Sequence, residues 1–294
     1  MRRHDFLFLA TLTFVVLGSA RFTHAQIDTS HTYCFGDSIT DNTHLFLFYG
    51  TNRTLYGADP VEAMFQKASA ETDTIHNYAR VGSTSSLIVA QVNYYAQKRK
   101  AGKTAPATLI SLQGGGNDVL FNVRQLAAET EESERIVRRI QHNLELCIKK
   151  LTEVDKAPIV LMTIPNLTVT PYLQSYKLTD NELAALKKNI QRLNEFILEY
   201  RQHPRMIVLE VDQVLEQVID QSLTIAGTPL SAPPLTGASY SIFADRVHPT
   251  AAANALVANH LIKLINSKFQ ADIQYYGEKE LAQLAGFPES LQTR

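Results

Sequence analysis

Five short, mostly apolar runs constrain the fold of this chain more strongly than any other feature. They contain many Val, Ile and Leu residues and cover Thr32–Phe35, Thr74–Tyr78, Thr108–Leu112, Pro158–Ile164 and Arg205–Val211. Runs of this kind are typical of strands that are buried on both faces of a parallel sheet. We therefore expect core strands that helices cover on both sides.

Stretches with the apolar spacing of an α-helix separate these runs. They cover Ser86–Lys100, Glu131–Leu151, Asp180–Tyr200 and Pro249–Ile265. Pro249 suits the first turn of the last helix. The alternation of strand and helix predicts an α/β sandwich with a mostly parallel sheet. No internal repeat and no long linker interrupts the pattern, which favours a single domain. Residues Gly227–Tyr240 are rich in Pro, Gly and Ser and predict a long surface loop.

The N-terminus has the layout of a secretory signal peptide. A positive start precedes an apolar stretch, Phe6–Ala20, that is shorter than the roughly 20 residues a membrane-spanning helix needs. Small residues allow cleavage after Ala20 or Ala25, and we favour Ala25 because a polar stretch follows it. We expect residues 1–25 to be the signal peptide, residues 26–294 to form one domain, and the mature protein to be secreted or periplasmic. The alternatives for the apolar stretch are an uncleaved anchor and a buried strand.

Composition argues against several functional classes. Lys plus Arg number 28 and Asp plus Glu 29, with no long run of like charge, so a broad nucleic-acid-binding face is not expected. The two cysteines, Cys34 and Cys147, are too few for a disulfide scaffold or an all-cysteine zinc site. Export would permit a disulfide between them. Both occupy apolar positions, however, which favours two buried free thiols.

Ser38 follows the first predicted strand, after Gly36 and Asp37. A serine at this position lies at the carboxyl edge of a parallel sheet, where ligands of this architecture bind. The alternative is a serine that caps the N-terminus of a helix. The segment lacks the G-x-S-x-G elbow of the α/β-hydrolases, which argues against that fold.

Asp245 and His248 stand three residues apart near the C-terminus. A serine nucleophile needs a base within hydrogen-bond reach, and the base needs an acceptor that fixes its tautomer. The spacing allows the carboxylate to face the imidazole on one turn. The alternative is a surface pair beside a helix-starting proline. No histidine has a recognisable metal-binding spacing.

Two glycine-containing motifs supply candidate oxyanion donors. Asn117 follows Gly114–Gly116 after the third strand, and its side-chain amide can donate to the oxygen of a tetrahedral intermediate. Gly82, after the second strand, can offer a backbone N–H to the same point. The alternative for the first motif is a flexible turn, and the residues that would make a nucleotide-binding loop are missing. Together with Ser38 and His248, these motifs supply a nucleophile, a base and oxyanion donors at one sheet edge.

The four motifs resemble those of the SGNH superfamily of GDSL-type lipases and esterases. In the family order, they are Gly-Asp-Ser-Ile with Ser38, Gly-Ser-Thr with Gly82, Gly-Gly-Asn-Asp with Asn117 and Asp-Arg-Val-His with His248. The resemblance covers most of the chain after the signal peptide. It implies a three-layer α/β/α sandwich with a mostly parallel, five-stranded, flavodoxin-like sheet.

Further stretches are similar to the branch that contains plant GDSL lipases and bacterial phospholipase and acyltransferase enzymes. These are Asp37–Asn42, Ile164–Leu167 and Phe243–Ala253. The chain departs from that branch at Ala244, where Trp is frequent, and at Asn254, where a second His is frequent.

Residues and resemblance together imply an ester hydrolase that forms an acyl-enzyme. Ser38 would attack the carbonyl, His248 would act as the base, and Asp245 would orient the imidazole. The backbone N–H groups of Ser38 and Gly82 and the side chain of Asn117 would hold the oxyanion. This chemistry needs no metal and no organic cofactor.

The branch resemblance favours a secreted hydrolase of lipid acyl esters, of the lipase, phospholipase A or lysophospholipase type. Transient contact with a membrane surface is then expected, without an obligate protein partner and without nucleic acid. The apolar run Leu45–Tyr49 after Ser38 either lines an acyl pocket or packs in the core, and core packing is favoured. A secreted carbohydrate O-acetyl esterase and a non-catalytic binding protein are the alternatives, and acyl transfer to an alcohol is a variant of the first.

Overall fold

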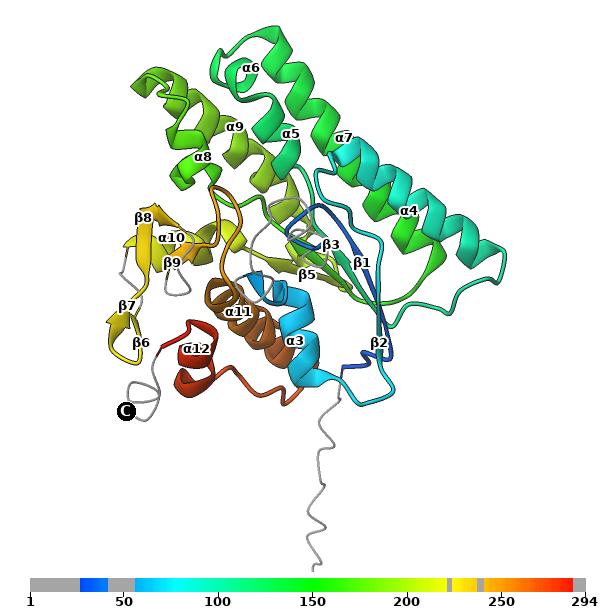
Figure 1. The fold of residues 1–294 in the computed structure, drawn as a ribbon. Helices are drawn as coiled ribbons and strands as arrows, with labels where there is room; N and C mark the ends of the chain where they lie inside the picture. Colours follow the sequence, from blue (N-terminus) through cyan, green and yellow to red (C-terminus); the bar gives the residue numbers. More distant parts are fainter. Residues whose placement is uncertain (1–26, 42–55, 221–223, 237–240, 288–294) are drawn as a thin grey trace, which may run out of the picture.

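A parallel sheet forms the centre of the molecule. The structure is a computed structural model, and it describes residues 27–41, 56–220, 224–236 and 241–287 (Figure 1). The sheet has the strand order β2-β1-β3-β4-β5. Its strands are β1 (His31–Phe35), β2 (Thr74–Asn77), β3 (Leu109–Leu112), β4 (Ile159–Met162) and β5 (Met206–Leu209).

All five strands coincide with the predicted runs, and every pairing between them is parallel. The observed order is that of the flavodoxin-like doubly wound sheets, in which the chain reverses its direction of winding next to the first strand. The predicted α/β/α fold class is therefore confirmed.

Helices follow the strands along the chain. They are α3 (Pro60–Ala68), α4 (Ser85–Lys100), α5 (Gly116–Phe121), α6 (Val123–Ala127), α7 (Glu131–Val154), α8 (Pro171–Gln174), α9 (Asp180–Leu198), α10 (Val211–Asp220), α11 (Ala251–Phe269) and α12 (Glu278–Leu284). Short 3₁₀ turns cover Leu167–Val169 and Glu199–Gln202. Among the described residues, no helix is both long and apolar enough to cross a bilayer.

Alternate side chains of each strand face opposite layers of helices, because successive residues of a strand point to opposite sides. Phe35 and Leu112 belong to the core that packs against α4, α7 and α9. Cys34 and Val160 belong to the core on the other face, which includes side chains of α3 and α11. Figure 1 shows these two helix layers on either side of the sheet.

The two cysteines are buried free thiols, as the sequence favoured. Cys34 lies in the core beneath α3 and α11, whereas Cys147 lies in the core beneath α4 and α9. The sheet therefore separates them. Burial raises the pKa of the Cys147 thiol to about 12, which keeps it protonated and unreactive at neutral pH.

Two predictions near the C-terminus differ from the structure. Thr250 is the N-cap of α11, and its Oγ1 accepts a hydrogen bond from the Ala253 N–H, so Pro249 precedes the helix instead of starting it. Pro249 pairs with Phe243 in an isolated bridge, and this tertiary contact overrides the preference of proline for a first helical turn.

The segment predicted as a long loop contains short strands. In the part that the structure describes, β6 (Thr224–Ile225) pairs with β7 (Thr228–Pro229), and β8 (Ser231–Thr236) pairs with β9 (Ser241–Phe243). Proline lacks the backbone donor that a central strand needs, but a two-stranded ribbon has free edges that tolerate it. Residues 1–25, the run Leu45–Tyr49 and residues 237–240 lie outside the described residues.

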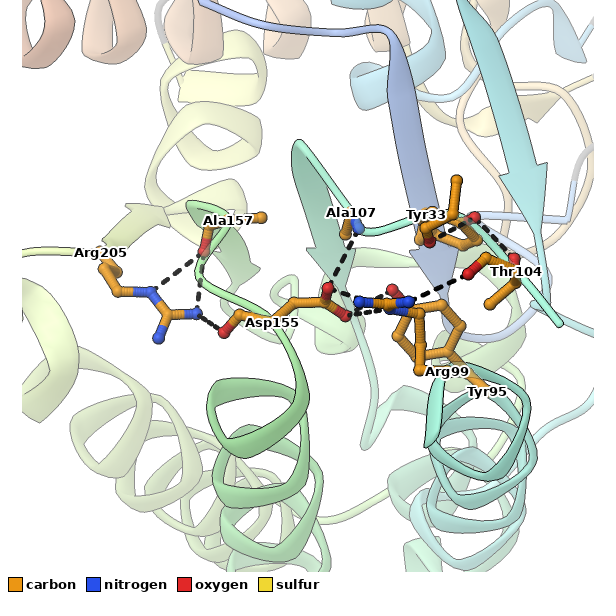
Figure 2. A network of polar contacts seen from close by, with 9 residues as sticks. Tyr33, Tyr95, Arg99, Thr104, Ala107, Asp155, Ala157 and Arg205 are labelled. Atoms are coloured by element: carbon orange, nitrogen blue, oxygen red, sulfur yellow. Dashed lines mark hydrogen bonds and ion pairs between the residues drawn. The ribbon is translucent and has the colours of Figure 1, made fainter. Parts of the chain in front are cut away.

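Asp155 connects the amino ends of three strands (Figure 2). Its carboxylate accepts hydrogen bonds from the Tyr95 hydroxyl at 2.6 Å, the Arg99 Nε at 3.1 Å and the Ala107 N–H at 3.2 Å. Its backbone carbonyl accepts a hydrogen bond from the Arg205 guanidinium at 2.7 Å. The side chain is almost fully buried, so these partners replace the water that the carboxylate loses on folding.

We expect Asp155→Ala to lower the free energy of unfolding by about 3 kcal/mol, because it leaves a largely buried guanidinium and a buried hydroxyl without their acceptor. Urea denaturation measures this loss. Glu153→Ala is the control, since Glu153 is an exposed carboxylate in the last turn of α7, for which Asp155 is the C-cap residue, and we expect its cost to be within about 0.5 kcal/mol. Equal costs for the two variants would contradict the role of the network.

Candidate active site

Ser38 lies in a tight turn at the carboxyl end of β1. The Asp37 carbonyl accepts hydrogen bonds from the N–H groups of Thr40 at 3.2 Å and Asp41 at 2.8 Å, which closes the turn. A Cβ atom on Gly36 would lie only 2.7 Å from Thr40 Oγ1, so this position requires glycine. The turn places Ser38 at the edge of the sheet where the sequence predicted it.

The Asp37 carboxylate holds the turn through two hydrogen bonds. One of its oxygens accepts a hydrogen bond from the Ile39 N–H at 3.0 Å, and the other accepts one from Gln113 Nε2 at 3.0 Å. Burial raises the pKa of Asp37 to about 6, although these two hydrogen bonds oppose the rise. Asp37 contacts the backbone of the turn and takes no place in the line of side chains that begins at Ser38.

Ser38, His248 and Asp245 form a continuous hydrogen-bonded line. Ser38 Oγ lies 2.8 Å from His248 Nε2, and His248 Nδ1 lies 2.7 Å from Asp245 Oδ2. An ionised carboxylate only accepts hydrogen bonds, so Nδ1 carries the proton and Nε2 accepts the hydrogen bond of the Ser38 hydroxyl. Residues that are 210 positions apart in the sequence thus meet at one point.

The Asp245 carboxylate is held in place by its own loop. Its Oδ1 accepts hydrogen bonds from the N–H groups of Val247 at 2.7 Å and His248 at 2.8 Å. Burial by itself would raise the pKa of Asp245, but the hydrogen bonds and the charge of His248, with the Val247 N–H, outweigh it and lower the pKa. Asp245 therefore stays ionised beside the imidazole at neutral pH.

Asn117 and Gly82 line the same cleft as the serine and the histidine. The Asn117 amide donates one hydrogen bond to the Ser83 carbonyl at 3.0 Å, which fixes the side chain. Asn117 lies in the first turn of α5, after Gly115 with φ of 97°. A Cβ atom on Gly115 would lie 2.7 Å from Ile164 Cδ1, so both the backbone angle and the space require glycine there.

The cleft has a volume of about 370 Å³ and mixes polar and apolar walls. Its lining residues are Ser38, Val81, Gly82, Asn117, Leu120, Phe121, Tyr172, Asp245, Arg246, Val247 and His248. It therefore contains all five site residues that the sequence predicted. Among the described residues, no group of three or more His, Cys, Asp or Glu side chains is arranged to hold a metal ion.

Tyr56 is a site residue that sequence reasoning missed. Its hydroxyl donates a hydrogen bond to Asp245 Oδ2 at 3.0 Å, the same oxygen that accepts from His248 Nδ1. An isolated tyrosine 189 positions before Asp245 carries no motif that could have revealed it. Asp245 Oδ2 thus takes part in two side-chain hydrogen bonds, while Oδ1 accepts two from backbone N–H groups.

Ala244 and Asn254, the two positions at which the chain departs from the plant and bacterial branch, both contact Tyr56. The Tyr56 ring packs with Ala244 in a small buried cluster, and Asn254 Nδ2 donates a hydrogen bond to the Tyr56 carbonyl at 3.2 Å. A bulky side chain at position 244 would compete with this ring for space. The signal was therefore in the sequence as two unexplained substitutions, but only the structure connects them.

Residues 33–261 match the family model of the GDSL-like lipases and acylhydrolases. This chain belongs to that family. The family consists of ester-hydrolysing enzymes, so the chain is an enzyme that acts on ester bonds. The family match extends from β1 into α11 and includes every residue of the hydrogen-bonded line. Among curated protein sequences, none matches this chain significantly.

Several solved structures share the fold. The lipase Lip_vut3 from a goat rumen metagenome has 18% sequence identity and a TM-score of 0.56, covering 80% of this chain and 97% of that chain. A protein of the lipolytic G-D-S-L family from Veillonella parvula has 19% identity and a TM-score of 0.50, covering 79% and 96%. An acetylxylan esterase from Geobacillus stearothermophilus has 17% identity and a TM-score of 0.50, covering 80% and 94%. At these identities the likeness establishes the fold alone.

Proposed function

We propose that the protein hydrolyses carboxylic esters with Ser38 as the nucleophile, His248 as the general base and Asp245 as the residue that orients the imidazole. The hydrogen-bonded line from Ser38 to Asp245 carries this proposal. A serine hydroxyl is a weak nucleophile by itself, and a base within hydrogen-bond reach removes its proton as the attack proceeds.

The reaction proceeds in two halves. Ser38 Oγ attacks the carbonyl carbon while its proton passes to His248 Nε2, and the imidazolium that forms is stabilised by Asp245. His248 then returns the proton to the leaving alkoxide, and an acyl-enzyme remains on Ser38. In the second half, water attacks the acyl-enzyme while His248 takes its proton. His248 then returns the proton to Ser38 Oγ as the bond to the acyl group breaks and the carboxylic acid leaves.

The oxyanion of each tetrahedral intermediate is held by the backbone N–H groups of Ser38 and Gly82 and by the Asn117 side chain. The hydrogen bond to Ser83 and the constrained turn at Gly115 support this assignment, because they fix the amide before the reaction starts. Donors that are fixed in advance need no reorganisation when the charge develops.

The substrate that we propose is a lipid acyl ester, of the lipase, phospholipase A or lysophospholipase type. The apolar side chains on the cleft walls, including Val81, Leu120 and Phe121, support it, because an acyl chain needs such surface. Phe121 is 61% exposed, which leaves a large ring at the rim available to an apolar substrate. The branch resemblance favours the same class, and the signal peptide pattern supports secretion.

A carbohydrate O-acetyl esterase is the second candidate. One of the proteins with this fold is an acetylxylan esterase, and an exposed ring such as that of Phe121 also suits stacking against a sugar. The two candidates differ in acyl chain length.

We expect Ser38→Ala to lower kcat by roughly 10³- to 10⁶-fold, because it removes the group that forms the acyl-enzyme. The mature protein, starting at Gln26, and its Ser38→Ala variant are assayed on p-nitrophenyl esters from acetate to palmitate. We expect Ser38-dependent activity that peaks at medium or long chains. Activity confined to acetate would favour the deacetylase, and full activity of a folded Ser38→Ala protein would refute the mechanism.

Asn117→Ala should lower kcat by roughly 10²- to 10³-fold with a smaller effect on KM, as for the loss of one oxyanion donor. Asn122→Ala provides a matched control, since Asn122 directly follows α5, donates to the Asp118 carbonyl and does not line the cleft. Steady-state kinetics on one ester compare the two variants. A similar loss in both would point to a structural effect on α5 instead of oxyanion binding.

Tyr56→Phe should lower kcat by roughly tenfold, because the Asp245 carboxylate loses one of the hydrogen bonds that fix it against His248. Tyr95→Phe removes an equivalent hydrogen bond to Asp155 at the opposite edge of the sheet. We expect this control to lower the denaturation midpoint and to leave kcat unchanged. The assignment fails if Tyr56→Phe reduces stability alone.

A further inference from the structure

Arg246 is a positively charged side chain on the cleft wall whose role the proposed mechanism leaves open. It lies between Asp245 and Val247 in the loop that carries His248, and it is the only lysine or arginine among the described residues that line the cleft. Its guanidinium has no carboxylate partner among the residues that the structure describes. Arg246 is exposed, so water solvates its charge and an anionic ligand can reach it.

Two contacts position the guanidinium, and a third holds its backbone. The guanidinium lies over the Tyr172 ring, with the Cζ atom 5.5 Å from the ring centroid, and its Nη2 donates a hydrogen bond to Ser175 Oγ at 2.7 Å. The Arg246 carbonyl accepts a hydrogen bond from the Tyr172 N–H at 3.0 Å, which ties the loop to α8. The Ser175 bond uses Nη2, and no described residue accepts a side-chain hydrogen bond from Nε or Nη1 of Arg246.

A second arginine, Arg124, makes a similar aromatic contact but has a structural role. Arg124 packs over Tyr176, with Cζ 5.7 Å from the ring centroid, and Tyr176 is hydrogen-bonded to Tyr172 at 3.1 Å. Arg124, however, forms an ion pair with Glu182 at 3.4 Å and does not line the cleft. The two arginines share the same kind of aromatic contact and differ in charge compensation and in access to the cleft.

The loop of Arg246 also carries His248, the residue that protonates the alcohol part of the ester in the proposed mechanism. His248 must hand its proton to the leaving alkoxide, so that oxygen lies next to His248 Nε2. Arg246 is two residues before His248 and lines the same cleft. A charged group on the alcohol is therefore the part of the substrate that we expect to meet Arg246.

We propose that Arg246 binds a phosphate group on the alcohol part of the substrate, as in an acyl ester of glycerol phosphate. This inference rests on the proposed ester hydrolysis and names the chemistry that its substrate carries. A guanidinium whose other N–H donors have no acceptor among the described residues matches the geometry of phosphate oxygens, and its contacts with Tyr172 and Ser175 reduce the entropy that is lost on binding. This contact would favour esters that carry a phosphate over those that do not, without changing the roles of Ser38, His248 and Asp245.

The test compares two esters that differ only in phosphate, 1-octanoylglycerol 3-phosphate and 1-octanoylglycerol, below their micelle concentrations. The readout is the ratio of their kcat/KM values, in which a general loss of activity cancels. We expect Arg246→Gln to lower this ratio roughly five- to tenfold, and Arg246→Lys to lower it less, because lysine keeps the charge but lacks the planar guanidinium that contacts Tyr172 and Ser175. Arg124→Gln is the matched control, and we expect its ratio to equal that of the wild type.

Salt gives a second readout. Raising the ionic strength from about 0.05 M to about 0.5 M should lower the wild-type ratio and leave that of Arg246→Gln nearly constant, since screening acts on the charge pair. The proposal is overturned if Arg246→Gln keeps the wild-type ratio, or if Arg124→Gln lowers it equally, while Ser38-dependent hydrolysis is present. If neither ester is hydrolysed in a Ser38-dependent way, the proposed function itself fails.

The same ratio measured on 1-acetylglycerol 3-phosphate and 1-acetylglycerol distinguishes the source of the phosphate. A higher kcat/KM for the octanoyl phosphate indicates a lysophospholipid-type substrate. A higher kcat/KM for the acetyl phosphate indicates a small acetylated phosphate ester. Either result supports the assignment when the ratio depends on Arg246.

Discussion

Burial of the sheet on both faces is the constraint on which the rest of the structure depends. Side chains from the middle of the strands, such as Tyr33 and Val160, enter one of two apolar cores. Charged groups are costly in these cores unless they are paired, so they concentrate where the strands begin or end. The parallel direction then gives the sheet two different edges, because all amino ends meet at one and all carboxyl ends at the other.

A carboxylate accepts several hydrogen bonds at each of these two edges, but its role differs between them. At the amino edge, the Asp155 carboxylate accepts from Tyr95 and Arg99 and connects strand ends to α4 and α7. At the carboxyl edge, the Asp245 carboxylate accepts from Tyr56 and His248. The first carboxylate has a permanent cation beside it. The second faces an imidazole that, in the proposed mechanism, becomes a cation only while the reaction proceeds.

The fold holds the polar groups of the cleft in place before a substrate binds. The turns at Gly36 and Gly115 admit no Cβ atom without a clash, and they precede Ser38 and Asn117. The Arg246 guanidinium is likewise held by Tyr172 and Ser175 before any ligand arrives. Groups that are fixed by the fold lose little entropy when a substrate binds, which is why an enzyme gains rate and selectivity from such positions.

The sequence by itself determined the five strands, the four long helices and the residues of the hydrogen-bonded line. Apolar runs and helical spacing report local burial, and Ser38, Gly82, Asn117, Asp245 and His248 lie in short contiguous motifs next to strand ends. The tertiary structure alone decided the hydrogen bond from Tyr56 to Asp245, the contact of Arg246 with the Tyr172 ring and the pairing of β8 with β9. Their partners are distant along the chain or have no local pattern, so the contacts exist only once the sheet and its helices have brought those segments together.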